Sequence, residues 1–137
     1  MREISSALKT FAEQYTDAWC SQDPEMVASF FAPGGSLTIN GGPASVGRAA
    51  IAAVAGEFMT AFPDLRVVMD GLVSAGDRVE YRWTLRGRNT GSGGTGHAVC
   101  ISGFESWHLG ADGLIEESLG SFDAGEYERQ ISGDAGD

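Results

Sequence analysis

Positive charge is scarce in this chain of 137 residues. Nine Lys and Arg residues stand against nineteen Asp and Glu, so the formal net charge at pH 7 is −10. Nucleic acids and anionic membrane surfaces attract clustered basic side chains, and this charge balance argues against either as a partner. No apolar run approaches the roughly 20 residues that span a bilayer, and the N-terminus lacks the apolar segment of a signal peptide. We therefore expect a cytoplasmic protein that binds neither nucleic acid nor membrane.

Cysteine and histidine are rare too, with two residues of each. Cys20 and Cys100 lie far apart, in no metal-binding or redox spacing, so buried reduced thiols are the simplest interpretation. His97 and His108 are acid–base candidates because imidazole titrates near neutral pH. However, His97 follows a glycine-rich turn, where we expect a surface position, and His108 should face the opposite side of its strand from Trp107. None of these residues has the spacing of a metal site, so we expect no metal.

Hydrophobic residues make up 42% of the chain, which is enough for one compact core. In the first part of the sequence they recur at steps of three and four residues, as on one face of a helix. Asp23 and Pro24 are typical of a helix start, where Asp caps the free N–H groups and Pro fits the first turn. Three helices are predicted, over residues 4–20, 24–31 and 47–61.

After residue 64 the hydrophobic period changes to two, which is typical of strands. Glycine-containing turns separate the strands, so consecutive strands should pair in the antiparallel sense. The string from Gly91 to Gly96 contains the G-x-G-x-x-G pattern of dinucleotide sites, but alternating residues rather than a helix follow it, so we interpret it as a hairpin connection. The predicted strands cover residues 36–40, 65–74, 78–88, 97–109 and 114–122, and a last helix is expected over 124–131.

Helices followed by strands with short turns favour an α+β fold. We expect one domain over residues 1–131, with three N-terminal helices packed on a curved, mainly antiparallel sheet, and a flexible acidic tail over 132–137. A funnel between the helices and the sheet would suit a small ligand. We also expect a homodimer through the outer face of the sheet, because that face should expose several apolar side chains: Val79, Val99, Ile101 and Leu119.

Several strings of this sequence resemble the SnoaL-like polyketide cyclases of the NTF2-like superfamily. The resemblance covers roughly residues 7–131 and depends on the order and spacing of the strings. It implies an NTF2-like cone, related to the folds of ketosteroid isomerase and limonene epoxide hydrolase, in a superfamily that includes enzymes and non-catalytic modules. The strings are Phe62-Pro63-Asp64-Leu65, Gly76-Asp77-Arg78-Val79, Arg82-Trp83-Thr84 and Asp112-Gly113-Leu114-Ile115-Glu116-Glu117, followed by Asp123.

The resemblance to ketosteroid isomerases assigns roles to three positions. Tyr15 and Glu105 match the tyrosine and the protonated acid that donate hydrogen bonds to a developing enolate. The catalytic base falls on Asn40, which cannot take up a proton at neutral pH. Two alternatives stay open: Tyr15 as an ordinary core tyrosine, and Glu105 as a solvated carboxylate on the outer face. We expect Glu105 to point inward, where burial would raise its pKa.

The other two chemistries of the superfamily are also incomplete in this sequence. Against limonene epoxide hydrolases, Asn40 and Arg82 match, but the two relay acids fall on Thr84 and Gly120. Against polyketide cyclases, the acid again falls on Gly120. Asp123, three residues later, reaches the pocket only if a bulge shifts the strand, and the alternative is a cap for the last helix.

The sequence therefore supports two hypotheses. The first is a cofactor-independent isomerase, cyclase or dehydratase that transfers protons on a small, largely apolar organic molecule. The second is a non-catalytic ligand-binding or dimerisation module that has lost the acids. In the first, the catalytic candidates are Tyr15, Asn40, Glu105 and Asp123, and the ligand-binding candidates are Trp19, Arg82, Trp107 and Phe122.

Overall fold

The computed structural model describes residues 4–91 and 93–133. The helices in this part of the chain are α1 (Ser6–Trp19), α2 (Pro24–Ala28), α3 (Arg48–Ala61) and α4 (Ala124–Ser132). The strands are β1 (Phe31–Ile39), β2 (Ser45–Val46), β3 (Arg66–Ala75), β4 (Arg78–Arg88), β5 (Ala98–Leu109) and β6 (Ile115–Phe122). None of the helices described has the length and apolar character needed to cross a membrane.

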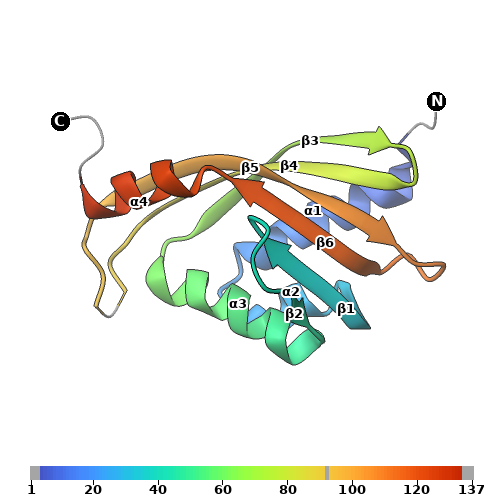
Figure 1. Ribbon diagram of the computed structural model, residues 1–137, viewed down its shortest axis with the longest axis horizontal. Helices are drawn as coiled ribbons and strands as arrows, with labels where there is room; N and C mark the ends of the chain where they lie inside the picture. Colours follow the sequence, from blue (N-terminus) through green and yellow to red (C-terminus); the bar gives the residue numbers. More distant parts are fainter. Residues whose placement is uncertain (1–3, 92, 134–137) are drawn as a thin grey trace.

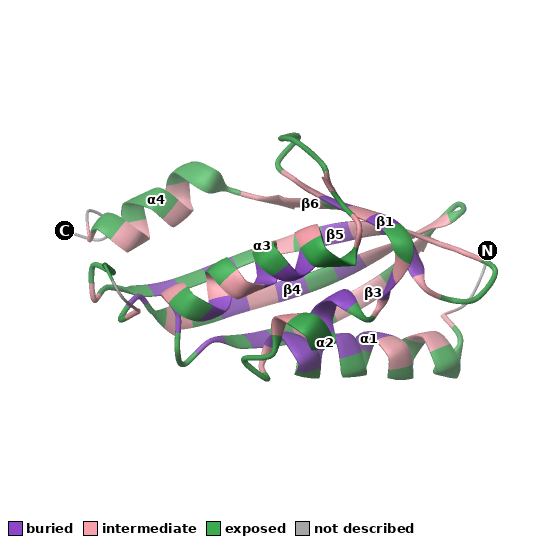
Figure 2. Ribbon diagram, turned by 90° about the horizontal axis from the view of Figure 1, so that it is seen from below, coloured by how far each residue is buried: buried purple, intermediate pink, exposed green. Residues whose placement is uncertain are grey.

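The strands form one sheet in the order β2-β1-β6-β5-β4-β3 (Figure 1). Each pair of neighbours is antiparallel except β1 and β6, which are parallel. Figure 2 shows α1, α2 and α3 with their buried residues turned toward the strands. The structure confirms the predicted α+β fold with a mainly antiparallel sheet.

Local capping explains where the first two helices begin. The side chain of Ser5 accepts a hydrogen bond from the Leu8 N–H at the start of α1. The side chain of Asp23 accepts from the N–H groups of Glu25 and Met26, and Pro24 occupies the first position of α2. These contacts satisfy N–H groups that have no partner inside the helix.

The predicted boundary between the second helix and the first strand was wrong. Helix α2 ends at Ala28, and Phe31 is already paired with Ile115 in the sheet. The Ile115 N–H donates to the Phe30 carbonyl at 3.0 Å, which draws the chain into the sheet three residues after α2. The following Pro-Gly-Gly, residues 33–35, lies in a register irregularity within β1. A long-range strand pair therefore overrides the local helical pattern.

The alternation of side chains places a large aromatic core on the helix side of the sheet. Tyr81 and Trp107 stack with their ring centroids 4.8 Å apart, and Tyr15 of α1 packs edge-on against both. Val99 and Ile101 belong to the same face, with exposed fractions of 2% and 7%. Their predicted outward position was wrong because they share the parity of Trp107 along β5.

Two further expectations about the outer face and the tail have different outcomes. Val79 is half-buried against the core, and of the four apolar residues expected outside only Leu119 is exposed, at 40%.

Ser132 is the last residue of α4, and Gly133 ends that helix in a left-handed conformation. The rest of the predicted tail, residues 134–137, lies outside the described residues.

The glycine-rich string connects two antiparallel strands, β4 and β5, as predicted for a hairpin. Asn89 organises this connection from a buried position. Its side-chain oxygen accepts from the Thr95 N–H at 2.8 Å, and its side-chain nitrogen donates to the Ala61 carbonyl at 3.1 Å. The loop is thereby tied to the end of α3, and no helix follows it.

Candidate functional site

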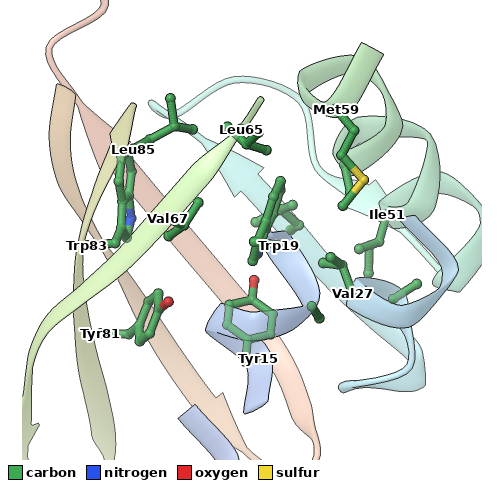
Figure 3. Packing of buried hydrophobic residues seen from close by; sticks show 14 of the residues in the cluster. Tyr15, Trp19, Val27, Ile51, Met59, Leu65, Val67, Tyr81, Trp83 and Leu85 are labelled. Carbon is green, nitrogen blue, oxygen red and sulfur yellow. The ribbon is translucent and has the colours of Figure 1, made fainter. Parts of the chain in front are cut away.

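A narrow cavity lies between the sheet and the helices α1, α3 and α4. Its volume is about 630 Å³ when counted together with open solvent at its mouth, and the part that a water-sized molecule reaches is far smaller. Its wall is almost entirely apolar, and Figure 3 shows four of the lining residues, Trp19, Val67, Trp83 and Leu85. Glu105 is the only carboxyl group among the described residues of this wall. An apolar cavity with very few polar groups is typical of small-molecule sites.

The Glu105 carboxyl is held by side chains from three different elements. Its Oε1 atom accepts hydrogen bonds from Ser118 Oγ at 2.8 Å, Trp107 Nε1 at 2.9 Å and Tyr15 Oη at 3.0 Å. Its Oε2 atom has one longer contact, 3.3 Å from Tyr15 Oη. The inward orientation of Glu105 and its contact with Tyr15 are therefore both present. Oε1 is saturated, whereas Oε2 keeps an unused lone pair.

Burial raises the pKa of Glu105, because a carboxylate loses its hydration in an apolar wall. The hydrogen bonds from Trp107, Ser118 and Tyr15 favour the carboxylate and offset part of this increase. All three donors are neutral, and none of the salt bridges in the described part of the chain involves Glu105. The carboxyl therefore holds its proton to a higher pH than an exposed glutamate does.

The two buried tyrosines act as hydrogen-bond donors rather than as bases. Burial, together with the nearby charge of Glu105, raises the pKa of Tyr15 well above its ordinary value. Burial also raises the pKa of Tyr81, whose hydroxyl lies 2.5 Å from Thr16 Oγ1. Since Thr16 donates its proton to the Ala12 carbonyl at 2.8 Å, the Tyr81 hydroxyl is the donor in that contact. Both hydroxyls keep their protons at neutral pH.

The structure places three predicted polar residues away from this cavity. Asn40 is exposed with a φ of 53°, and its Oδ1 accepts from the Phe122 N–H at 2.9 Å. Arg82 lies on the outer face and donates to Glu80 at 2.5 Å. Asp123 caps α4 by accepting from the Glu126 N–H at 3.0 Å. In these positions each side chain stabilises local structure.

The remaining predicted residues divide between wall and surface. Trp19 and Phe122 line the cavity, whereas Trp107 lies behind Glu105 and donates to it. His108 lies 3.5 Å from Glu116 at the surface. Cys20 is half-buried, and its sulfur forms hydrogen bonds with the Val67 backbone. Cys100 is exposed, so the expectation of two buried thiols was wrong for Cys100.

Sequence reasoning missed Ser118, which completes the set of donors to Glu105. The register pairs Ser118 with Trp107 across β5 and β6, which brings its hydroxyl beside the carboxyl. Simple alternation from Ile115, which is buried, would instead turn Ser118 outward. A register shift between His108 and Leu109 changes which face of the sheet Ser118 occupies, and no pattern in the sequence predicts this shift.

A family model described as the SnoaL-like domain matches residues 12–118, most of the chain. The chain belongs to this family. No curated protein sequence matches this SnoaL-like chain.

Solved structures of other proteins share the fold of this SnoaL-like chain. A protein from Catenulispora acidiphila with a ketosteroid isomerase-like fold, in complex with trimethylamine, has 16% identity and a TM-score of 0.77 over 88% of this chain and 91% of its own. A candidate SnoaL-like polyketide cyclase from Jannaschia sp. CCS1 has 20% identity and a TM-score of 0.74 over 96% and 98%. TerC, co-crystallised with polyporic acid, has 18% identity and a TM-score of 0.72 over 90% and 96%.

Two positions where acids were expected have different surroundings in this SnoaL-like domain. Gly120 lines the cavity directly opposite Glu105 in the β5–β6 ladder. Thr84 lies on the outer face and donates to Asp70 at 2.6 Å. A carboxyl group at position 120 would therefore stand beside Glu105, and glycine leaves that space to a ligand.

Proposed function

We propose that this SnoaL-like protein binds a small, largely apolar organic molecule in the cavity and catalyses cofactor-independent proton transfer on it. Glu105 is the acid–base group, and the reaction class is isomerisation or cyclisation. The observation that supports this is a single carboxyl group, buried in an apolar wall, held by neutral donors and with a raised pKa. A raised pKa makes a carboxyl group a stronger base when ionised, and perturbed carboxyl groups of this kind serve as general acids and bases in enzymes.

The geometry assigns the two carboxyl oxygens different roles. Oε1 is fixed by Tyr15, Trp107 and Ser118, so Oε2 is the oxygen that meets the ligand. Ionised Oε2 takes a proton from a carbon next to a carbonyl group, and the C–H electron pair forms an enolate. Where a C=C bond adjoins that carbon the enolate is a dienolate, and the protonated carboxyl returns the proton to its far end, the γ-carbon, so that the C=C bond moves into conjugation with the carbonyl. One residue thus completes an isomerisation, and Oε1 stays in place throughout.

The related structures support a pocket for small organic molecules. TerC was co-crystallised with polyporic acid, and the Catenulispora protein was crystallised in complex with trimethylamine. Polyporic acid and trimethylamine were crystallised with those relatives and are not assigned to this chain. Here the apolar wall favours a ligand with a hydrophobic body, and the single carboxyl favours one polar end.

One observation favours the second hypothesis, a non-catalytic binding module. Asn40, Arg82 and Asp123 all lie outside the cavity, so Glu105 has no second acid or base beside it in the described wall. In such a module Glu105 would only donate a hydrogen bond to its ligand. The two hypotheses predict the same binding but different proton exchange.

The test uses 2-acetonaphthone, an apolar ketone whose methyl protons exchange with D2O through an enolate. We expect the protein to bind this probe and to accelerate the exchange, as followed by proton NMR. Glu105→Gln should keep binding and lose the acceleration, because an amide cannot take up the proton. Glu13→Gln, at an exposed position on α1, is the matched control and should behave as wild type. Binding without exchange in the wild type would support the non-catalytic module, and absence of binding would refute both hypotheses.

A further inference from the structure

The indole N–H of Trp83 has no assigned role in the chemistry above. Trp83 lines the same cavity as Glu105, and its side chain is nine-tenths buried, with 9% of the residue exposed. Its Nε1 atom is the only buried side-chain nitrogen or oxygen in the described part of the chain that lacks a hydrogen-bond partner. Buried N–H groups almost always have a partner, so this exception calls for a physical explanation.

Packing, not hydrogen bonding, keeps the indole in this place. Trp83 lies opposite Gly103 across β4 and β5, and a β-carbon at position 103 would come within 2.7 Å of the indole Cζ2 atom. The ring therefore lies across the space that glycine leaves open. Phe122, the partner of Gly103 on β6, packs edge-on against the indole, with ring centroids 6.0 Å apart. The chain thus holds a donor in a site where the protein supplies no acceptor.

The register relates this donor to the carboxyl. Trp83 pairs with Gly103 and Tyr81 pairs with Glu105, so Trp83 and Glu105 are diagonal neighbours on the same face of the sheet. The β-carbons of such neighbours are roughly 7 Å apart. A small molecule in the cavity can therefore meet the N–H of one and the Oε2 atom of the other, each with a different part of its polar end.

We propose that the Trp83 N–H donates a hydrogen bond to an oxygen acceptor of the ligand, which makes the ligand class an apolar molecule with a carbonyl group at one end. This inference rests on the proposed function. When Oε2 of Glu105 removes the proton next to the carbonyl, the C–H pair becomes a C=C bond and the carbonyl π pair moves onto oxygen. The Trp83 N–H then faces the atom that gains negative charge, where a preorganised donor lowers the barrier most.

The nitrogen is closed to solvent. The wall must therefore widen locally when the acceptor arrives, and we expect the half-buried ring of Phe122 to turn aside. Bulk water cannot satisfy this N–H in its place. We expect the acceptor to be an atom of the ligand inside the cavity.

The experiment compares 2-acetonaphthone with 2-isopropenylnaphthalene, which has the same shape but carries a CH2 group in place of the carbonyl oxygen. The chain has three tryptophans, so its nitrogen–proton NMR spectrum should contain three indole signals, and Trp83→Phe identifies the one from Trp83. We expect the ketone, but not the hydrocarbon, to move the Trp83 indole proton downfield in the wild-type protein. We also expect the ketone to bind roughly three- to tenfold more tightly than the hydrocarbon, the usual effect of one hydrogen bond. Trp83→Phe keeps an aromatic ring and should remove that difference.

The outcomes separate this inference from the proposed function. If both probes bind equally and the Trp83 signal responds to both alike, the role of Trp83 is refuted while the apolar pocket stands. If neither probe binds, the proposed function fails, and the role of Trp83 fails with it. The relative affinity of the wild-type protein for the two probes already decides these cases, so the test does not depend on the folding of Trp83→Phe.

Discussion

Gly120 lies directly opposite Glu105 in the β5–β6 ladder, so the one carboxyl of the cavity wall faces a residue without a side chain. The nearest atoms to a β-carbon at position 120 would be the Thr38 carbonyl oxygen at 3.5 Å and Glu105 Cγ at 3.8 Å. These are ordinary contact distances. The space beside the carboxyl therefore exists because of the residue type at position 120.

The first prediction compares two glycines of adjacent strands. Gly120→Ala should change the free energy of unfolding by less than about 1 kcal/mol, because its β-carbon fits. Gly103→Ala should cost more than about 2 kcal/mol, since its β-carbon would lie 2.3 Å from the Ser121 carbonyl oxygen and 2.7 Å from Trp83. Urea unfolding of both variants checks this. Equal stability of the two would contradict the packing described here.

The second prediction concerns Gly120→Leu. The larger side chain should fill the space next to Glu105 and abolish binding of 2-acetonaphthone, while circular dichroism shows a folded protein. Gly120→Ala is its control and should retain most of the binding. Undiminished binding by Gly120→Leu would mean that the probe occupies another site.

The third prediction is a pH dependence of stability. Because the folded-state pKa of Glu105 is raised, its stabilising contribution is complete below the ordinary glutamate pKa of about 4.3 and is lost as the pH rises through the folded-state pKa. Wild type should therefore lose stability relative to Glu105→Gln above pH ~4.3, by at most about 1.4 kcal/mol per pH unit. Urea unfolding at a series of pH values measures this difference. Glu13→Gln leaves Glu105 intact and should retain the decline. A constant difference between wild type and Glu105→Gln would show that the carboxyl is not perturbed.

The fourth prediction concerns the donors to Glu105. Ser118→Ala removes a hydrogen bond that favours the carboxylate, so the pKa of Glu105 should rise further, with a loss of roughly 1–2 kcal/mol in stability. Carbon NMR of the Glu105 carboxyl reports that pKa directly. Ser102→Ala, on the outer face where Ser102 contacts Thr84, is the matched control and should leave it unchanged. A lower pKa in Ser118→Ala would reverse the role given to this hydroxyl.

The fifth prediction concerns quaternary structure. We still expect a homodimer through the outer face of the sheet, as the sequence suggested. Its exposed apolar residues there include Leu119, Phe104 and Val68, with exposed fractions of 40%, 38% and 46%, rather than Val99 and Ile101. Sedimentation at micromolar concentration should show a dimer, and Leu119→Glu should shift it toward monomer. Val46→Glu, an exposed change on β2, serves as the control. A monomeric wild-type protein at that concentration would contradict this prediction.

Much of the fold followed from local patterns, because capping residues and hydrophobic periods act over a few positions. Strand β4 was predicted at its observed bounds, whereas alternation left two faces open for Glu105 and the family resemblance selected the inner one. Local patterns failed to predict the structure where pairing between strands distant in the sequence determines it. The chain from Phe31 joins β6 rather than continuing a helix.

The site was less predictable than the fold for a related reason. The contact between Tyr15 and Glu105 was expected from the family resemblance, but Ser118 depends on a register shift that leaves no local signal. Trp83 is an ordinary core residue by its sequence context. Only the absence of a partner for its nitrogen, visible once all neighbours are placed, distinguishes it.

The parallel pairing of β1 with β6 has a consequence for how the chain is made. Phe31 and Ile115, which pair across these strands, are separated by most of the sequence. Closing so long a loop is entropically costly, and folds dominated by such contacts form slowly. During synthesis the apolar faces of α1 and α3 leave the ribosome well before β6 exists to complete the sheet they cover. A nascent chain of this protein should therefore expose its aromatic core residues until β6 emerges, and aggregation is most favoured during that interval.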